Sequence, residues 1–374
     1  MKPQVYQRRP GVWSVVIEVG KQPREQKWIT VRGTKREAQA KWVELTQQVQ
    51  TGRFVRDTKK TVEGWLSEWL EKWVRVSVRP STFQSYTDAV KFWGGLGNVA
   101  LADLDAVTIQ GLVAQAIEEG YAPATIRQRL AVLRAALNRA VMCGMLYRDP
   151  SRGVTISTER REVRALDVAG LGKVLKAAEN TSWHLPILIA ATTGMRRGEV
   201  LALRWQDVDL EGGSFRVTHS YGADGMGPAK TRGSNRPLPL PPITVEAMRQ
   251  EHKRQAEKKL RYGGGYADLG LVCADERGNH LKPASLTIRF GEIARSVGAD
   301  ITFHGLRATH ATMLLGAGIN TKVVQERLGH SRASQTLDRY SAVLPSMQAE
   351  AVRVLNGLLP AVGTDEILGA SNGR

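Results

Sequence analysis

The sequence predicts a multidomain protein that is mainly α-helical with small β-sheets. Three observations support this fold class. The chain has 374 residues, which is enough for about two or three domains. Hydrophobic residues make up 42% of it, so each domain can bury a core. Apolar residues recur at helical spacing through most of the chain, while β-rich runs are short and few.

Residues 1–55 are predicted to form a small sheet packed against one helix. The β-rich run Val12–Val19 is followed by Gly and Pro, and Trp28–Val31 can pair back as a second strand. Thr34 and Glu37 have the spacing of a capping box, and apolar residues at helical spacing follow them. We therefore expect a hairpin and then a helix.

Residues 63–150 are predicted to form an all-helical domain, which the polar residues 56–62 link to the first. Trp65, Trp69 and Trp73 follow one another at intervals of four residues, so they share a helix face. Such an aromatic stripe is more often part of a core than a platform on which bases stack.

One helix of this region has two chemically different faces. Between Pro123 and Val141 the apolar residues line one face, while Arg127, Arg134 and Asn138 fall together on another. Side chains of this kind can lie along DNA phosphates. An ordinary solvated face is the alternative that the sequence leaves open.

The rest of the chain is predicted to form a second linker at residues 151–164, a large domain at residues 165–360 and a tail at residues 361–374. The large domain is expected to be mostly helical. Its β-rich runs lie near residues 214–219 and 236–240, so an α+β domain with a small sheet is expected.

The net charge of +17 indicates an anionic partner, most simply nucleic acid. Residues 1–60 have 14 Lys and Arg against 5 Asp and Glu, a net +9. Residues 61–160 have a net +1, and residues 161–374 a net +7. The concentration of charge in the first segment predicts a separate nucleic-acid-binding module, and a basic solubilising tail is the alternative.

Several classes of protein are disfavoured. Cys143 and Cys273 are too few for a disulfide framework, which favours a reducing compartment. The N-terminus lacks the apolar core of a signal peptide, and no apolar run is long enough to span a membrane. We also expect no metal or other cofactor, because no ligands are spaced as in known metal motifs.

An ordered set of polar residues lies in the last domain. Arg196 follows a Thr-Gly pair at the start of an apolar helical stretch, in the string TTGMRRGEVLALRW. His304 and Arg307 are three residues apart, so on a helix they share a face. His330 follows in the string LGH, and Tyr340 in the string LDRY.

These strings resemble the tyrosine recombinase family, which includes the phage integrases. The family signature is an Arg, a strand-borne Lys, His-x-x-Arg, a further His and a nucleophilic Tyr about ten residues later. Lys230, in PAKTRGSNRPLPL, matches the lysine, so every member of the set has a match. The resemblance implies an arm-site-binding domain at residues 1–55, a helical, SAM-like core-binding domain at residues 63–150 and a catalytic domain at residues 165–360.

The resemblance implies that the protein cleaves and rejoins DNA without a metal ion, through a 3′-phosphotyrosyl intermediate. Two arginines suit this chemistry, since each guanidinium offers a fork of donors matched to phosphate, and Arg196 and Arg307 are the candidates. Tyr340 is the candidate nucleophile and His304 the base that takes its proton. Lys230 is the candidate donor of a proton to the leaving 5′ oxygen.

The neighbouring residues are predicted to have supporting roles. His330 is expected to hydrogen-bond the phosphate, and Arg197 and Arg232 are expected to contact DNA. Glu199 stands three residues after the first catalytic arginine, which favours a structural ion pair. His310 is expected to be a packing residue. The sequence departs from the family after the His and the Arg of His-x-x-Arg, where an acidic residue and a His are common.

The resemblance further implies that double-stranded DNA, with core and arm sites, is the partner, and that the protein acts as a homotetramer on two paired sites. It leaves room for a directionality factor or a DNA-bending host protein. The helix expected at Met347–Leu359 would dock on a neighbouring subunit or on its own domain. The expected location is the cytoplasm of a bacterial host, at the nucleoid when DNA is bound.

Three alternatives to an integrase are a chromosome-dimer-resolving recombinase, an enzyme like the type IB topoisomerases, and a catalytically silent DNA-binding regulator with the same fold. The basic first 60 residues disfavour the resolving recombinase, which usually lacks an arm module. The complete set of six signature residues disfavours the regulator.

Overall fold

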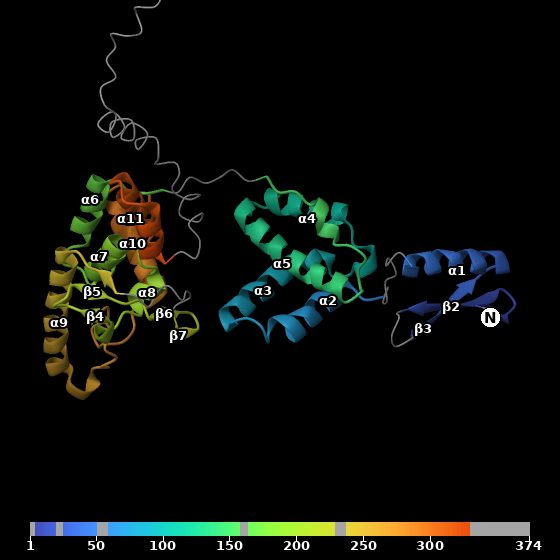
Figure 1. Ribbon diagram of the computed structural model, residues 1–374, viewed down its shortest axis with the longest axis horizontal. Helices are drawn as coiled ribbons and strands as arrows, with labels where there is room; N and C mark the ends of the chain where they lie inside the picture. Colours follow the sequence, from blue (N-terminus) through green and yellow to red (C-terminus); the bar gives the residue numbers. More distant parts are fainter. Residues whose placement is uncertain (1–3, 20–24, 51–58, 158–163, 229–236, 330–374) are drawn as a thin grey trace, which may run out of the picture. The chain divides into compact units, whose positions relative to one another are not determined.

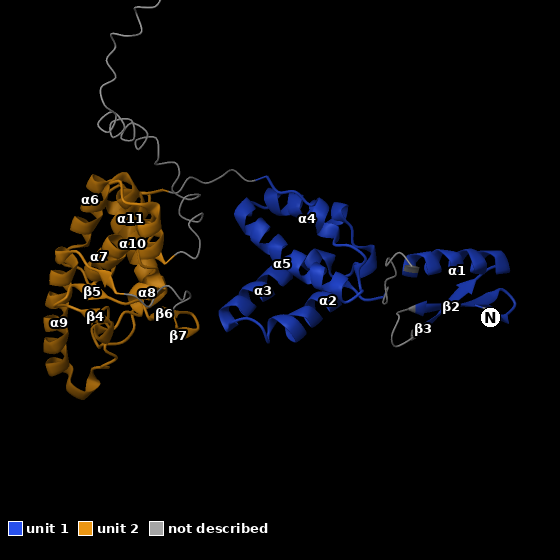
Figure 2. Cartoon of the chain, in the orientation of Figure 1, with its two compact units in different colours: residues 1–160 blue, residues 161–374 orange. Residues whose placement is uncertain are grey.

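The structure is a computed structural model, and it describes residues 4–19, 25–50, 59–157, 164–228 and 237–329. The chain divides into two compact units, residues 1–160 and 161–374 (Figure 2). It is mainly helical with small antiparallel sheets, which confirms the predicted fold class (Figure 1). Within the described ranges, no helix is both long and apolar enough to cross a membrane.

The first unit begins with a three-stranded antiparallel sheet and a helix, β1 (Val5–Arg9), β2 (Val12–Val19), β3 (Glu25–Arg32) and α1 (Lys35–Gln50). Helix α1 packs on the sheet, and Val15 and Ile17 of β2 are buried there (Figure 1). The Thr34 N–H donates to Glu37 Oε2 (2.7 Å) and the Glu37 N–H to Thr34 Oγ1 (3.3 Å), so the predicted capping box is confirmed. Strand β1 was not predicted, because its mostly polar residues lack the alternation of a half-buried strand.

The rest of this unit is helical. Its helices are α2 (Val62–Trp69), the π-helix η1 (Leu70–Val74), α3 (Pro80–Phe92), the 3-10 helices η2 (Trp93–Leu96), η3 (Leu101–Asp103) and η4 (Pro150–Gly153), α4 (Ala106–Glu118) and α5 (Pro123–Met142). Trp65 and Trp69 are buried and Trp73 packs beside them, which confirms the tryptophan stripe as core. Val154 belongs to this core, so the first part of the expected linker packs with the first unit.

In its described residues, the second unit contains two small antiparallel sheets and a set of helices. Its elements are α6 (Val168–Ala178), α7 (His184–Thr193), α8 (Arg197–Leu201), η5 (Trp205–Asp207), β4 (Val208–Asp209), β5 (Ser214–Phe215), β6 (His219–Gly222), β7 (Gly225–Pro228), β8 (Leu238–Pro239), α9 (Pro242–Tyr262), η7 (Gly263–Gly265), α10 (Pro283–Ser296), α11 (Gly305–Gly316) and α12 (Thr321–Leu328). Strands β4, β5 and β8 form one sheet, and β6 and β7 a hairpin.

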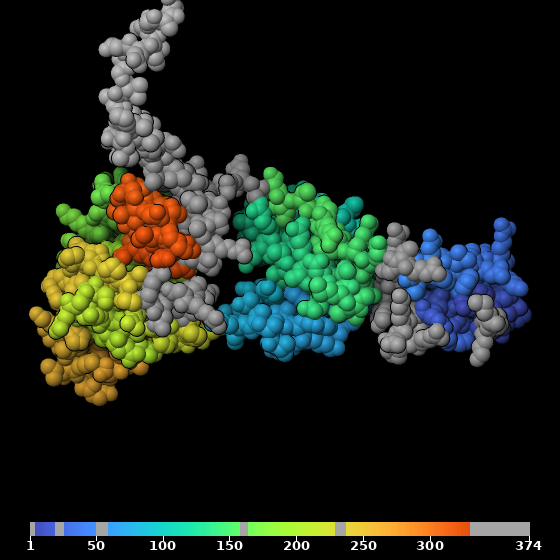
Figure 3. Space-filling model, in the orientation of Figure 1, coloured from blue at the N-terminus to red at the C-terminus, as the bar shows by residue number. Residues whose placement is uncertain are grey.

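Helix α7 is the centre of the second unit. Its residues from Leu185 to Ala191 are all buried, as expected of a helix that is apolar on every side. It contacts α6, α8, α9 and α11. Helices α11 and α12, in orange, form part of the surface in the space-filling view (Figure 3). The unit therefore surrounds one buried helix, and the C-terminal end of that helix positions the candidate site.

Candidate active site

The candidate site starts at the turn that ends α7. Gly194 has φ +70°, a left-handed conformation that terminates the helix. A Cβ atom at this position would lie 2.6 Å from Leu328 Cδ2 and 2.9 Å from His310 Cδ2. Both the conformation and the close approach require glycine. The turn then places Arg196 directly before α8, as its N-cap residue.

Glu199 holds Arg196 by both its main chain and its side chain. The Arg196 N–H donates to Glu199 Oε2 (2.8 Å), and the Arg196 guanidinium donates to Glu199 Oε1 through NH1 (2.8 Å). Glu199 is buried, while 31% of the Arg196 side chain is exposed. The predicted ion pair is confirmed. It fixes the NH1 end of the guanidinium, while the side chain as a whole remains partly accessible to solvent.

Arg307 is held by main-chain carbonyls and is only 3% exposed. Its NH1 donates to the Gly194 carbonyl (2.7 Å) and its NH2 to the Leu328 carbonyl (2.6 Å). The Gly194 carbonyl lies at the negative end of α7, which favours a cation. Arg307 therefore ties α11 to the turn before Arg196 and to the end of α12.

A recess in the second unit is lined by residues from β8, α8, α11 and α12. Arg307 and Glu199 both contribute to its wall, together with Leu238, Arg327 and Gly329. The structure thus brings together segments that are more than 100 residues apart in the sequence. Its wall carries the guanidinium groups of Arg307 and Arg327 beside the carboxylates of Glu199 and Glu326. The fork of N–H donors on a guanidinium matches phosphate geometry.

His304 is the N-cap residue of α11, which places it one helical turn before Arg307. Its side chain is exposed, whereas that of Arg307 is buried. The departures from the family pattern beside these residues have a packing explanation. A Cβ atom at Gly305 would lie 2.4 Å from Ile301 Cγ1, so a larger side chain does not fit there. Ala308 is buried in a small core with Leu315 and other residues of α11 and α12.

His310 is buried, as predicted for a packing residue, but it also makes two hydrogen bonds that the sequence did not indicate. Arg327 Nε donates to His310 Nε2 (3.2 Å), so this nitrogen must be the acceptor. The other nitrogen, Nδ1, is then protonated and donates to the Ala191 carbonyl (3.0 Å). Burial and the nearby Arg327 charge lower the pKa of His310 to about 4, so the imidazole is neutral at physiological pH.

Arg327 is a residue that sequence reasoning missed. Its NH2 donates to the carbonyls of Thr192 (3.3 Å) and Pro239 (3.0 Å), in addition to the bond with His310. Burial lowers the pKa of Arg327 from its usual value. Its position three residues before His330, in the string ERLGH, was the available signal.

The remaining predicted residues of the large domain are only partly described. Lys230, Arg232, His330 and Tyr340 lie outside the described residues, as does the expected helix at the C-terminal end. Arg197 is exposed, and its NH1 donates to Thr287 Oγ1 (2.5 Å) on α10.

The predicted DNA-contacting residues of α5 lie in the first unit. Arg127 and Asn138 are exposed. Arg134 is half-buried, and its NH2 donates to the carbonyls of Ser151 (3.2 Å) and Val154 (3.1 Å). Arg134 thus holds the segment after α5 against that helix, a contact that the helical pattern alone did not indicate.

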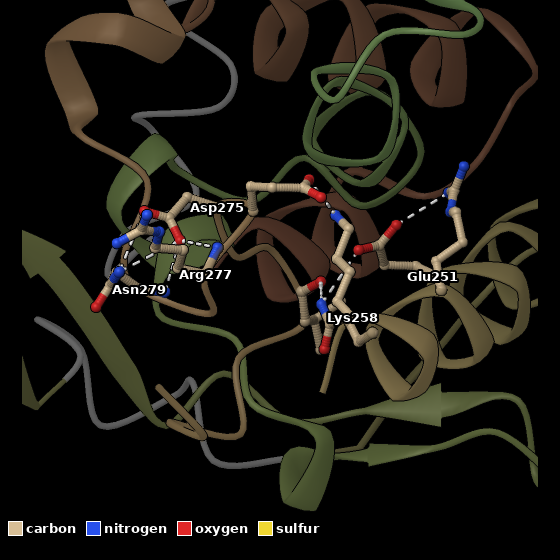
Figure 4. A network of polar contacts seen from close by, with 9 residues as sticks. Glu251, Lys258, Asp275, Arg277 and Asn279 are labelled. Carbon is tan, nitrogen blue, oxygen red and sulfur yellow. Dashed lines mark hydrogen bonds and ion pairs between the residues drawn. The ribbon is translucent and has the colours of Figure 1, made fainter. Parts of the chain in front are cut away.

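A second polar cluster, in the second unit, consists of ion pairs and hydrogen bonds that close a turn (Figure 4). Glu251 pairs with Arg254 (3.0 Å), and Lys258 with Glu276 (3.0 Å). Asp275 accepts hydrogen bonds from main-chain N–H groups two and four residues later, which closes a turn. In the part of the chain that the structure describes, no group of three His, Cys, Asp or Glu side chains is arranged to hold a metal ion.

The chain is similar to known recombinases and integrases. Residues 165–347 match the phage integrase family. The chain is 29% identical over 353 residues to a protein named "Tyrosine recombinase XerC-like" from Caldanaerobacter subterraneus subsp. tengcongensis, which covers 87% of this chain and 90% of that relative. It is 28% identical over 373 residues to an integrase from Streptomyces ambofaciens, covering 92% and 93% of the two chains.

Solved structures share the fold. The Tn1549 transposon integrase in complex with transposon right end DNA superimposes with a TM-score of 0.68 at 20% identity, covering 79% of this chain and 100% of that chain. A lambda integrase tetramer bound to a Holliday junction gives a TM-score of 0.59 at 20% identity, covering 90% and 95%. At these identities the likeness concerns the fold.

Proposed function

The chain belongs to the phage integrase family of tyrosine recombinases, and from this premise we propose that it integrates and excises a phage or other mobile element. It is a site-specific recombinase that cleaves and rejoins DNA with a tyrosine nucleophile. The observation that best supports its activity is the arrangement of Arg196 and Arg307. A buried contact between Arg307 and the turn at Gly194 brings these two cations to one end of α7.

In the proposed reaction the Tyr340 hydroxyl attacks the scissile phosphorus. His304 takes the tyrosine proton, the 5′ oxygen leaves with a proton from Lys230, and a 3′-phosphotyrosyl bond forms. Arg196 and Arg307 offset the charge that develops on the non-bridging oxygens.

His330 hydrogen-bonds the same phosphate in this proposal. The phosphotyrosyl bond retains the energy of the phosphodiester. A 5′-hydroxyl from the second DNA strand can therefore attack it, which rejoins the strands and releases the tyrosine without ATP.

We assign DNA recognition to the two N-terminal regions, residues 1–55 for arm sites and residues 63–150 for the core site. The net +9 of the first 60 residues supports the first assignment. The exposed Arg127 and Asn138 of α5, with Arg134 between them, are the candidates for core-site contacts. In the catalytic domain the candidates are Arg197 and Arg232.

The assembly that we propose is a homotetramer on two paired double-stranded DNA sites. A lambda integrase of the same fold is a tetramer on a Holliday junction, which supports this arrangement. Directionality would come from an accessory factor or a DNA-bending host protein, and the reaction would take place on DNA in the bacterial cytoplasm.

A chromosome-dimer-resolving recombinase is the second candidate, because one relative has a XerC-like name and matches most of the chain. The sheet and helix of residues 4–50 disfavour it, since a resolving recombinase usually lacks such a module. Recombination that requires DNA outside the core site would support the integrase.

The deciding experiment is a covalent trapping assay. The full chain is incubated with a nicked suicide duplex that spans the boundary of the element carrying its gene. We expect a protein–DNA adduct whose 3′ phosphate is attached to Tyr340. The variant Tyr340→Phe should form none, while the matched variant Tyr262→Phe, on α9, should behave as wild type. A wild-type protein without an adduct, or an adduct with Tyr340→Phe, would contradict the proposed catalysis.

A further inference from the structure

Arg327 is a half-buried cation that the proposed reaction does not use. Its guanidinium joins four segments of the catalytic unit. From α12 it donates to His310 on α11, to the Thr192 carbonyl at the end of α7, and to the Pro239 carbonyl in β8. Because a guanidinium is planar and donates in several directions, it can hold three acceptors at once.

The contacts of Arg327 adjoin those of Arg307. The residue after Arg327 is Leu328, whose carbonyl accepts a hydrogen bond from Arg307 NH2 (2.6 Å). His310, the side-chain partner of Arg327, stands one helical turn after Arg307 on α11. The two arginines therefore share the same three helices.

The end of α7 is where these contacts meet. The carbonyls of Ala191, Thr192 and Gly194 accept hydrogen bonds from His310, Arg327 and Arg307 respectively. These carbonyls belong to the last turn of a helix, where cations and N–H donors are favourable. Removing the Arg327 guanidinium would leave the Thr192 carbonyl without this hydrogen bond. The end of α12 would then be free to shift away from α7.

We propose that Arg327 is a positioning residue for strand cleavage: it holds the end of α12 against the end of α7, so that the Leu328 carbonyl keeps Arg307 directed at the scissile phosphate. This inference rests on the proposed function, because it assigns Arg307 to that phosphate. A lysine at this position keeps the charge but lacks the planar fork, so it restores the arrangement only in part.

A role of Arg327 in general stability and a role in positioning Arg307 give different results in a cleavage assay. Loss of general stability would lower the amount of folded protein and affect all substrates alike. A positioning role affects the step in which Arg307 contacts the negatively charged phosphate. A site with a neutral methylphosphonate at the scissile position removes the charge that Arg307 stabilises, so the defect should disappear on that substrate.

The test compares wild type with Arg327→Gln, Arg327→Lys and the matched variant Arg249→Gln. Arg249 also donates to a main-chain carbonyl, that of Leu210 (2.9 Å), but it lies on α9 and makes no hydrogen bond to Arg307, His310, Thr192, Pro239 or Leu328. The readouts are the single-turnover rate of adduct formation on a saturating suicide site, the affinity for that site, and the melting temperature. Each substrate carries either the natural phosphate or a methylphosphonate.

We expect Arg327→Gln to slow adduct formation by about 30-fold or more on the natural phosphate, with affinity changed less than about threefold. Arg327→Lys should recover part of the rate, and Arg249→Gln should match wild type. On the methylphosphonate, Arg327→Gln and wild type should differ by less than about threefold.

The inference fails, and the proposed function stands, if wild type forms the adduct and Arg327→Gln forms it as fast. The same holds if Arg327→Gln slows adduct formation equally on the phosphate and the methylphosphonate. If Arg327→Gln does not fold, Arg327→Lys decides, and a wild-type rate in that variant overturns the inference. If wild type itself forms no adduct, the proposed function fails and this inference fails with it.

Discussion

Arg134 in the first unit and Arg307 in the second are held in nearly the same way. Each lies on a helix and donates hydrogen bonds to two main-chain carbonyls. The carbonyls that Arg134 contacts are 17 and 20 residues away in the sequence, whereas those of Arg307 are 21 and 113 residues away. Arg134 thus fixes a neighbouring turn, while Arg307 joins distant segments.

Burial separates the two arginines further. Arg134 is half-buried beside a short 3-10 helix, but Arg307 is almost fully buried. Glu199 and Arg327 line the same recess as Arg307. The same local chemistry therefore stabilises a turn in one region and builds a candidate site in the other. The sequence separation of the partners and the burial of the guanidinium decide which of these two roles an arginine has. A helical pattern shows neither of them.

The largest expected effect is the loss of cleavage rate when the Arg307 guanidinium is removed, and the Arg134 guanidinium provides the comparison. Arg307→Gln should slow phosphotyrosyl adduct formation by about 10²–10³-fold, because it removes donors to the developing phosphate charge. Arg134→Gln should change the rate at saturating DNA less than about threefold, because any DNA contact it makes would affect affinity, and it should lower the free energy of unfolding by about 1 kcal/mol. Single-turnover cleavage and chemical denaturation measure the two effects. Equal rate losses in both variants would break the comparison.

A somewhat smaller effect is expected at the turn that receives Arg307. Gly194→Ala should lower the free energy of unfolding by about 2–3 kcal/mol, since a side chain there is strained at φ +70° and collides with Leu328 and His310. Gly172→Ala, in α6, is the control, because a Cβ there meets no atom within 4 Å. Alanine should raise helix stability at that position by about 0.5–1 kcal/mol. Denaturation showing the same change for both variants would contradict the close packing at Gly194.

The smallest effect depends on pH. His310 faces Arg307 on its own helix and Arg327 from α12, and its pKa is lowered from 6.5 to about 4. As the pH falls, His310 of the unfolded chain is therefore protonated near pH 6.5, whereas His310 of the folded protein is protonated only near pH 4. The free energy of unfolding should be unaffected by this group above pH 6.5 and should fall below it, by up to about 1.4 kcal/mol per pH unit.

The difference between wild type and His310→Gln tests this expectation, because other titrating groups cancel. Glutamine does not titrate, so the destabilisation caused by the substitution should be about 1–2 kcal/mol smaller at pH 5 than at pH 7. Denaturation curves at the two pH values give the comparison. A destabilisation that does not change with pH would show that His310 is not held neutral.

Elements with strong local signals could be predicted from the sequence. The capping box of Thr34 and Glu37, the buried tryptophan stripe and the ion pair of Glu199 all depend on residues within one or two helical turns. Strand β1 could not be predicted, because its pairing with β2 rather than its own pattern makes it a strand. The contacts of Arg134 and Arg327 were not predicted either, because their partners lie in segments that only the tertiary structure brings near.

The sequence alone determined the fold class and the family and predicted the catalytic side chains, because helical periodicity and short ordered motifs can be recognised without the tertiary structure. Only the tertiary structure decided which partners hold those side chains. Arg307 reaches the Gly194 carbonyl across 113 residues, and His310 accepts from Arg327 on another helix. Such contacts form because burial forces each donor to find an acceptor, and the packing of α7, α11 and α12 determines which acceptor is near.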